Sequence, residues 1–581
     1  MKFLRNLLAT LAGLFIFSII VVILIGAFVS LATMEEEVTV KENSVLHIKL
    51  NKPINERAFQ DPFNELFTGY SSNVGLIELI ESIEDAKEND KIKGIYLESG
   101  IPMGGFASIE AIRKALNDFK NSGKFITSYA EIYTEGGYYI ASTADDIYLN
   151  PRGYFELNGI SANVTFLKGM FDKLEIEPEI FRVGDFKSAV EPLIRKDMSD
   201  ENRLQLDALL NSIYNNYLNE VAESRSIPFE RLTTISDSML AKTPKDALET
   251  ELVTGLKYFD EVLDDLRSKL ELEEDDKINF IGFEKYHKSI SKKNTSKNRV
   301  AVIVGSGEIM GGKGDNSSIG STSFAKEIRK ARKDDKVKAV VIRVNSPGGS
   351  ALASDVIWRE IMLTKQVKPV IASMSDYAAS GGYYIAMACD TIVAEPSTIT
   401  GSIGIFLTMF NLEKFLDNKL GITTDVVKTG EYTDLYTFTR ALTEGERNII
   451  QNSVNEGYED FVAKAAENRN MTVEDLKKIA SGRVWSGIQA LENGLIDELG
   501  GLDDAIDMAV NAAGIADDYK IRYYPKQKNF IEQVKEEFSS DLESRFLKSK
   551  TGDLYPLIKQ IRSLENLKGL QTRMLYEIRL E

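Results

Sequence analysis

Short apolar, β-branched runs alternate with helical patterns along most of the chain. VAVIVGSG (300–307), KAVVIRVN (338–345) and KPVIASM (368–374) have the composition of buried strands. Between the last two runs, SDVIWREIMLTKQ (354–366) spaces its apolar residues as a helix does. Strands that alternate with helices predict βαβ units with right-handed crossovers, and therefore an α/β fold.

The alternating pattern occurs twice. GGYYIA stands at 136–141 and again, unchanged, at 381–386, about 245 residues further on. Four more pairs of segments match in the same order and at nearly the same offset: 91–105 with 336–350, 144–151 with 389–396, 181–189 with 426–434, and 246–253 with 489–496. We therefore predict two α/β domains of one type, at 45–295 and 299–525, joined by the polar segment 289–298.

A long apolar run stands near the N-terminus. Residues 7–32 are uncharged, and this run is longer than the roughly 20 residues that span a bilayer. Lys2 and Arg5 precede it and three glutamates follow it, so the positive-inside rule puts residues 1–6 in the cytoplasm. A cleaved signal peptide is the alternative, although its apolar core is usually about 7–15 residues. We expect a transmembrane helix over 7–32, with both domains outside the cytoplasm.

The tail, residues 526–581, has a different pattern. Apolar side chains recur every four residues at Phe530, Val534, Phe538, Leu542 and Phe546. This spacing forms one apolar stripe on a helix. We expect a helical tail that packs on its own domain or on another subunit, with membrane contact as the alternative.

The composition narrows the possible chemistry. A net charge of −18 argues against nucleic acid as a partner. The single cysteine, Cys389, excludes an intramolecular disulfide and a Cys-rich zinc site, and we expect neither a metal nor a cofactor. The only histidines, His47 and His287, lack flanking glycine-rich turns, and we interpret both as structural or exposed. A Ser-His-Asp or Cys-His mechanism is therefore disfavoured.

The two copies differ at chemically important positions. Ser380, in YAASGGYYIA, matches Glu135 in the first copy, and Lys187, in VGDFKS, matches Thr433 in the second. One copy has the hydroxyl without the amine, and the other has the amine without the hydroxyl. This complementary loss is expected if the two copies together form a single site. We therefore predict a dyad, with Ser380 as nucleophile and Lys187 as general base.

The chemistry of such a dyad requires further groups. A serine hydroxyl needs a neighbouring base, and a lysine serves once burial lowers its pKa from about 10.4. Such a lysine is usually held by another hydroxyl, for which Ser402 in TITGSIGIF (398–406) is the candidate. Gly349, in SPGGS, and Gly381, directly after the serine, offer backbone N–H groups for an oxyanion hole.

These residues resemble the signal peptide peptidase A family (protease IV, peptidase family S49), in its long form with two fused repeats. The resemblance is carried by DYAASGGYY (376–384), FRVGDFKSAVEP (181–192) and GRVWSGIQALENGLIDELGG (482–501), and it extends to about residue 520. It implies stacked ββα units of the Clp protease and crotonase type, with the lysine from the first repeat and the serine from the second. The family's lysine-orienting serine falls on Ser402.

The resemblance also implies a biological setting. Members of this family are serine endopeptidases on the outer, periplasmic or extracytoplasmic, side of the bacterial cytoplasmic membrane. They act on hydrophobic peptides, including cleaved signal peptides, and form a homotetramer. Two alternatives stay open, a crotonase-like acyl-CoA enzyme and a non-catalytic membrane scaffold. Whether Ser380 and Lys187 meet within one subunit or across two is also left open by the sequence.

Overall fold

The computed structural model describes residues 5, 6, 10, 13, 14, 16, 17, 38–58, 73–290, 295–315, 317–526 and 569–574. The segment 7–32, with its predicted transmembrane helix, falls almost entirely outside these residues, and so does the apolar stripe at 530–546. Within the described parts of the chain, no helix is both long and apolar enough to cross a membrane.

The first repeat is built on a parallel sheet with strand order β8-β6-β5-β4-β1-β9. Its strands are β1 (Ser44–Lys49), β4 (Ile92–Glu98), β5 (Phe125–Tyr133), β6 (Asp146–Phe155), β8 (Gly255–Leu256) and β9 (Asn279–Gly282), with a small pair β2 (Ile54–Asn55) and β3 (Val74–Gly75) beside them. Its helices are α3 (Leu76–Glu88), α4 (Phe106–Lys120), α5 (Glu135–Ala141), α9 (Phe229–Asp237), α10 (Pro244–Glu249), α11 (Phe259–Lys269) and α12 (Phe283–Ser289). Leu46, Ile48 and Ile95 are fully buried, as expected where helices cover both faces of a parallel sheet.

The second repeat is built on a larger sheet with strand order β19-β17-β15-β13-β10-β21, and β16 and β20 continue from β15. Its strands are β10 (Arg299–Ser306), β13 (Val337–Ser346), β15 (Val370–Ala379), β16 (Thr391–Ala394), β17 (Ile399–Gly401), β19 (Val484–Ser486), β20 (Glu498–Leu499) and β21 (Lys520–Tyr524). Its helices are α13 (Ser321–Lys333), α14 (Ala351–Lys365), α15 (Gly381–Ala386), α16 (Glu413–Leu420), α17 (Glu444–Asn468), α18 (Val473–Ile479), α19 (Gly487–Glu492) and α20 (Leu502–Ala512).

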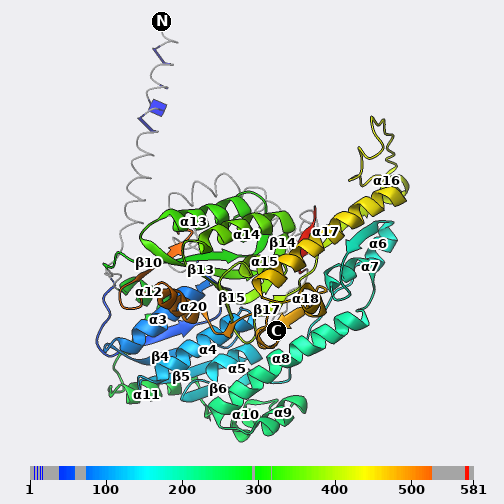
Figure 1. Ribbon diagram of the computed structural model, residues 1–581. Helices are drawn as coiled ribbons and strands as arrows, with labels where there is room; N and C mark the ends of the chain where they lie inside the picture. The colour runs from blue at the N-terminus through cyan, green and yellow to red at the C-terminus, as the bar shows by residue number, and fades with distance from the viewer. Residues whose placement is uncertain are drawn as a thin grey trace.

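The predicted duplication is visible in the strand order. In the first repeat β5, β4, β1 and β9 are neighbours, and in the second β15, β13, β10 and β21 stand in the same order. The strands predicted at 300–307, 338–345 and 368–374 are confirmed as β10, β13 and β15, and the helix at 354–366 as α14. The two repeats lie one above the other, the first in blue and cyan and the second in green and yellow (Figure 1).

A third sheet joins the two repeats and the tail, with order β12-β11-β14-β22-β18-β7. Its strands are β7 (Glu177–Arg182), β11 (Glu308–Met310), β12 (Ser318–Gly320), β14 (Gly348–Ser350), β18 (Phe406–Asn411) and β22 (Gln571–Arg573). β7 belongs to the first repeat and pairs antiparallel with β18 of the second along its whole length. The prediction of a helical tail is wrong for β22, because β14 and β18 both pair with its backbone.

An arm of the first repeat extends along the second. It contains α6 (Lys168–Leu174), β7, the 3₁₀ turn Ser188–Val190, α7 (Glu191–Ile194) and the long helix α8 (Asp200–Arg225), which borders the molecule in Figure 1. Gln205 on α8 bonds the backbone N–H of Val484, and Ser212 bonds Ser486. Through these contacts the arm fixes where the predicted base stands relative to the second repeat.

Buried polar groups also hold the repeats together. Glu56 of the first repeat and Arg343 of β13 form an ion pair of 2.8 Å, and each side chain is only 2% exposed. The Asp376 carboxylate accepts hydrogen bonds from the backbone N–H and the hydroxyl of Ser108. Buried charges that lose their partner cost several kcal/mol, so these pairs favour one defined arrangement of the two repeats.

Candidate active site

Ser380 stands at a sharp turn between β15 and α15. Its backbone has φ 55° and ψ −109°, a conformation that is sparsely populated by residues with a Cβ. The Ser380 N–H donates to Gly401 O at 2.8 Å, and Tyr384 N–H donates to Ser380 O at 2.8 Å. A strained serine between a strand and a helix is typical of hydrolase nucleophiles. With β22 in place, Ser380 is 0% exposed.

The glycines after Ser380 are required by close packing. A Cβ on Gly381 would lie 2.7 Å from Ser354 Oγ and 3.1 Å from Gly349 N. A Cβ on Gly382 would lie 2.6 Å from Ser346 O. The sequence SGG therefore lets α15 begin directly against β13 and β14.

Lys187 reaches Ser380 from the first repeat. Its Nζ lies 2.9 Å from Ser380 Oγ, 3.0 Å from Ser402 Oγ and 3.2 Å from Ser402 O. The side chain is 1% exposed. All three residues belong to one chain, so the structure brings the predicted nucleophile, base and orienting serine together without a second subunit.

Two features of the second repeat receive the lysine. β7 ends five residues before Lys187 and is aligned by its pairing with β18. A Cβ on Gly482 would lie 2.6 Å from Lys187 Cβ, and one on Gly404 would lie 3.2 Å from Lys187 Cδ. The stem of Lys187 thus packs between two glycines. The sequence reasoning misses Gly404 and Gly482, since neither carries a reactive group.

The environment of Lys187 favours its neutral form. Burial alone lowers the pKa of Lys187 from 10.5 to about 7. Among the described residues, the hydrogen-bond partners of its Nζ are hydroxyl and carbonyl oxygens and not carboxylates. A neutral amine would therefore be well populated near neutral pH.

The hydrogen bonds account for each group on that amine. The Ser402 hydroxyl donates to Gly482 O at 3.2 Å, so its Oγ accepts one N–H of Lys187. Ser402 O accepts the second N–H. In the neutral amine these two bonds use both N–H groups, which leaves the nitrogen lone pair for the Ser380 hydroxyl, as general-base catalysis requires.

The two glycine amides predicted for an oxyanion hole lie side by side. Gly349 is in β14 and Gly381 is the first residue of α15. A Cβ on Gly381 would lie 3.1 Å from Gly349 N, and one on Gly348 would lie 2.8 Å from Gly381 N. Gly348 has φ 101°, which only glycine adopts without strain. Paired amides beside a serine can stabilise a developing oxyanion.

The corresponding place in the first repeat holds a different group. Glu135 opens α5 and its buried carboxylate accepts the N–H groups of Asn158 and Gly159 at 2.8 and 2.6 Å. Burial raises the pKa of Glu135 to about 7. Thr433, which matches Lys187, lies in an exposed loop. The first repeat therefore lacks a nucleophile at the Glu135 position, and the second repeat lacks a base at the Thr433 position.

Other candidate groups lie apart from the dyad. His47 bonds Glu98, and His287 bonds Glu81, all within the first repeat. Among the described residues, no three His, Cys, Asp or Glu side chains are grouped to hold a metal ion.

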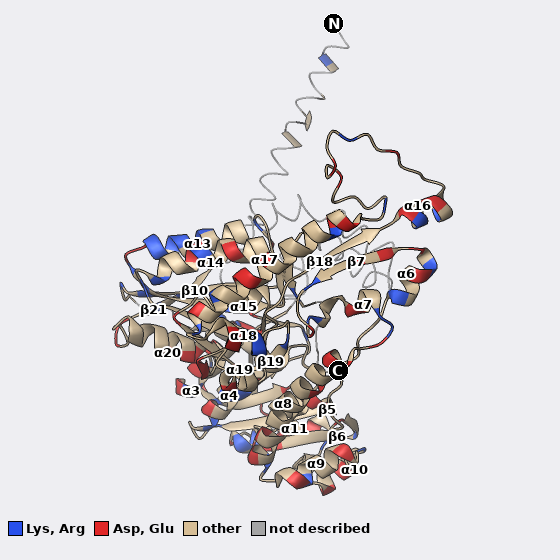
Figure 2. Cartoon of the chain, turned by 45° about the vertical axis from the view of Figure 1, so that its right-hand side comes forward, with Lys and Arg blue, Asp and Glu red and all other residues tan. Residues whose placement is uncertain are grey.

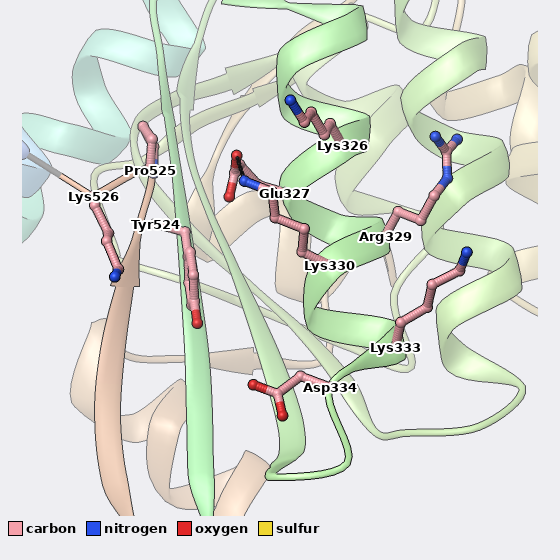
Figure 3. Close-up of a pocket in the computed structure, with 9 residues that line it drawn as sticks. All are labelled: Lys326, Glu327, Arg329, Lys330, Lys333, Asp334, Tyr524, Pro525 and Lys526. Atoms are coloured by element: carbon pink, nitrogen blue, oxygen red, sulfur yellow. Dashed lines mark hydrogen bonds and ion pairs between the residues drawn. The ribbon is translucent and has the colours of Figure 1, made fainter. Parts of the chain in front are cut away.

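A surface pocket lies between α13 and the end of β21. In Figure 3 charged side chains surround it, and in Figure 2 the same helix carries a cluster of blue residues. Its lining residues are Lys326, Glu327, Arg329, Lys330, Lys333, Asp334, Tyr524, Pro525 and Lys526. None of the predicted catalytic residues belongs to this pocket.

Comparison with known proteins extends these findings. Residues 118–273 and 362–516 match peptidase family S49, one match in each repeat. The chain is 37% identical over 486 residues to the chloroplastic serine protease SPPA of Arabidopsis thaliana, which covers 82% of this chain and 70% of the relative. It is 37% identical to Protease 4 of Haemophilus influenzae (78% and 75% covered). It is 36% identical to Protease 4 of Salmonella typhi (79% and 75% covered).

Proposed function

Since the chain belongs to peptidase family S49 and is a serine peptidase of its long, two-repeat type, we propose that Ser380 and Lys187 form its catalytic dyad. The observation that carries this proposal is the 2.9 Å contact between Lys187 Nζ and Ser380 Oγ. The lysine is buried and its pKa is lowered to about 7, so the contact joins a nucleophile to a usable base.

The geometry supports an acyl-enzyme mechanism. Neutral Lys187 takes the Ser380 proton while Oγ attacks the scissile carbonyl carbon. The N–H groups of Gly349 and Gly381 stabilise the tetrahedral oxyanion. The Lys187 ammonium then protonates the leaving amine, and the C–N bond breaks. Lys187 next removes a proton from water, which attacks the ester carbonyl carbon. The C–O bond to Ser380 then breaks, the acid leaves, and Lys187 returns the proton to Ser380 Oγ.

The proposed substrates are hydrophobic peptides, such as cleaved signal peptides, met at a membrane. In support, residues 7–32 form an uncharged apolar run with basic residues before it and acidic residues after it. We propose that this run anchors the enzyme in the bacterial cytoplasmic membrane with both repeats on the outer side.

Hydrolysis is expected to depend on pH through Lys187. A pKa lowered to about 7 means that the reactive neutral amine predominates above this pH and is lost below it. The kcat/KM for an apolar peptide should therefore fall about tenfold for each pH unit below about 6 and level off above about 8. A pH series from 5 to 9 measures this. His287→Ala should leave the profile unchanged, and a rate independent of pH across this range would contradict the assignment.

We also propose that a second copy of this chain is a partner. Within the chain, β7 pairs with β18, with Arg182 opposite Phe406. Shifted by the offset of about 245 residues, the counterparts are segment 422–427 in the second repeat and segment 161–166 in the first. Both segments lie outside the helices and strands, and neither is paired in a sheet. An equivalent strand pairing between two copies would join segment 422–427 of one copy to segment 161–166 of the other. We call this contact the joint.

The exposure of segment 422–427 supports such a joint. Val427 is 99% exposed and Ile422 is 51% exposed. Exposed apolar patches on a soluble protein usually mark contact sites. Segment 161–166 alternates exposed and half-buried residues, as a strand awaiting a partner does. The loop after α16 projects away from the body in both views (Figures 1 and 2). A head-to-tail contact of this kind generates a ring when its rotation closes, and a ring of four copies is the proposed homotetramer.

Val427→Asp is expected to dissociate this assembly, because it places a charge in the proposed strand pairing. Analytical ultracentrifugation of the detergent-solubilised protein should show a homo-oligomer for the wild type and a monomer for the variant. Val367→Asp is the matched control, since Val367 is 64% exposed in a turn outside the joint. An unchanged mass for Val427→Asp would rule out this joint.

A further inference from the structure

The short strand β22 lies directly on the candidate active site. It is antiparallel to β14 on one side and to β18 on the other, and it is drawn in red beside β14 in Figure 1. Thr572 is opposite Gly349, the residue assigned to the oxyanion hole. Thr572 and Gln571 are almost completely buried. Residues from the far end of the chain thus fill the space between two strands of the site.

The register places a peptide carbonyl at the glycine amides. Met574 N–H donates to Pro347 O at 2.9 Å, and Ala351 N–H donates to Leu570 O at 3.1 Å. In an antiparallel ladder hydrogen-bonded pairs alternate with non-bonded pairs, so Gly349 and Thr572 form the bonded pair between these two. A Cβ on Gly348 would lie 2.0 Å from Thr572 O and 2.8 Å from Gly381 N. The Thr572 carbonyl therefore lies beside both oxyanion amides.

The side chains of the strand are anchored on either side. Arg573 forms an ion pair of 2.9 Å with Glu308 of β11. Thr572 Oγ1 donates to Gly349 O at 3.1 Å. Met574 is buried in an apolar cluster to which both repeats contribute: Phe106, Leu206, Leu209 and Ile213 from the first, and Ile399 and Val484 from the second. The Met574 side chain is thus held by apolar side chains of both repeats.

We propose that residues 570–574 occupy the peptide-binding groove and compete with substrate, so that the C-terminal segment restrains the activity of its own active site. The proposal rests on the dyad proposed above. An extended peptide that joins a sheet edge binds through its main chain and places alternate side chains in pockets, and the tail makes these contacts already. With the tail bound, Ser380 is 0% exposed, so a peptide or a probe reaches it only after the tail leaves.

Removing residues 569–581 is the direct test. A fluorophosphonate should label Ser380 of the shortened chain about tenfold faster than the full chain, because the apparent reactivity scales with the open fraction. The kcat/KM for an apolar fluorogenic peptide should rise by a similar factor. A synthetic GLQTRM peptide (569–574) should inhibit the shortened chain competitively, and a scrambled peptide of the same composition should not.

A second variant tests the same point in the full-length chain. Met574→Asp puts a carboxylate into the apolar cluster and should also speed labelling, whereas Met170→Asp, at a half-exposed position away from β22, should not. Labelling at the wild-type rate in both the shortened chain and Met574→Asp would overturn the competition by the tail while leaving the dyad intact. The absence of labelling in every form would overturn the dyad, and this inference with it.

Discussion

Ser380→Ala is expected to lower peptide hydrolysis by on the order of 10⁴-fold or more, because the proposed acyl-enzyme forms on the Ser380 hydroxyl. Substitution of a single nucleophile in a dyad or triad removes almost all of the catalysis that the set provides. The measurement is kcat/KM for an apolar peptide with purified protein. Hydrolysis above about one hundredth of the wild-type rate would show that Ser380 is not the nucleophile.

Ser380→Gly is the companion variant that separates catalysis from folding. Glycine adopts the φ of 55° without strain, so this variant should be at least as resistant to urea as the wild type. It should nevertheless be as inactive as Ser380→Ala. Loss of activity in a fully folded Ser380→Gly protein assigns the effect to the missing hydroxyl.

Lys187→Met is expected to reduce hydrolysis to a similar extent, by on the order of 10³- to 10⁴-fold, because it removes the base but keeps an unbranched apolar stem in a buried site. Lys187→Arg should also be inactive, because a guanidinium does not lose its proton to act as a base. Activity assays of both variants therefore distinguish a base from a positive charge.

Histidine variants are the controls for this second prediction. His47 and His287 bond Glu98 and Glu81 rather than the dyad. His47→Ala and His287→Ala should keep nearly full activity. A histidine variant without activity, or an active Lys187→Arg, would contradict the assignment of Lys187 as the base.

The sequence predicts much of this site because the duplication is so direct. GGYYIA identifies the same turn in both repeats, and the exchange of Ser380 for Glu135 and of Lys187 for Thr433 reveals which repeat supplies which group. The structure places Lys187 Nζ within 3.2 Å of both Ser380 and Ser402. This contact could be predicted because the two repeats diverged at the residues that form it, and the sequence shows where they diverged.

Other features depend on contacts between distant segments. Nothing in EPEIFR (177–182) indicates that β7 pairs with β18 of the other repeat rather than within its own. Gly482 acquires its role only because the stem of Lys187 packs on it. QTR (571–573) lacks the alternation of a strand, and it is extended because β14 and β18 offer it partners on both sides. Such non-local pairing is set by tertiary context rather than by local propensity.

Membership of a serine peptidase family disfavours the two alternatives that the sequence leaves open. A crotonase-like acyl-CoA enzyme would use the amides of Gly349 and Gly381 but has no use for a neutral lysine at Ser380 Oγ. A non-catalytic scaffold has no reason to keep a buried lysine oriented by Ser402. Peptide hydrolysis explains both the paired glycine amides and the buried lysine.

The most direct test of the account is to map the residue that a fluorophosphonate modifies. Full-length wild type and Lys187→Met are incubated with the probe at pH 8 for the same time, and the adducts are located by tandem mass spectrometry. We expect one adduct, on Ser380, in the wild type and almost none in Lys187→Met. An adduct on another serine, or equal modification of Ser380 without Lys187, would contradict a single site built from both repeats.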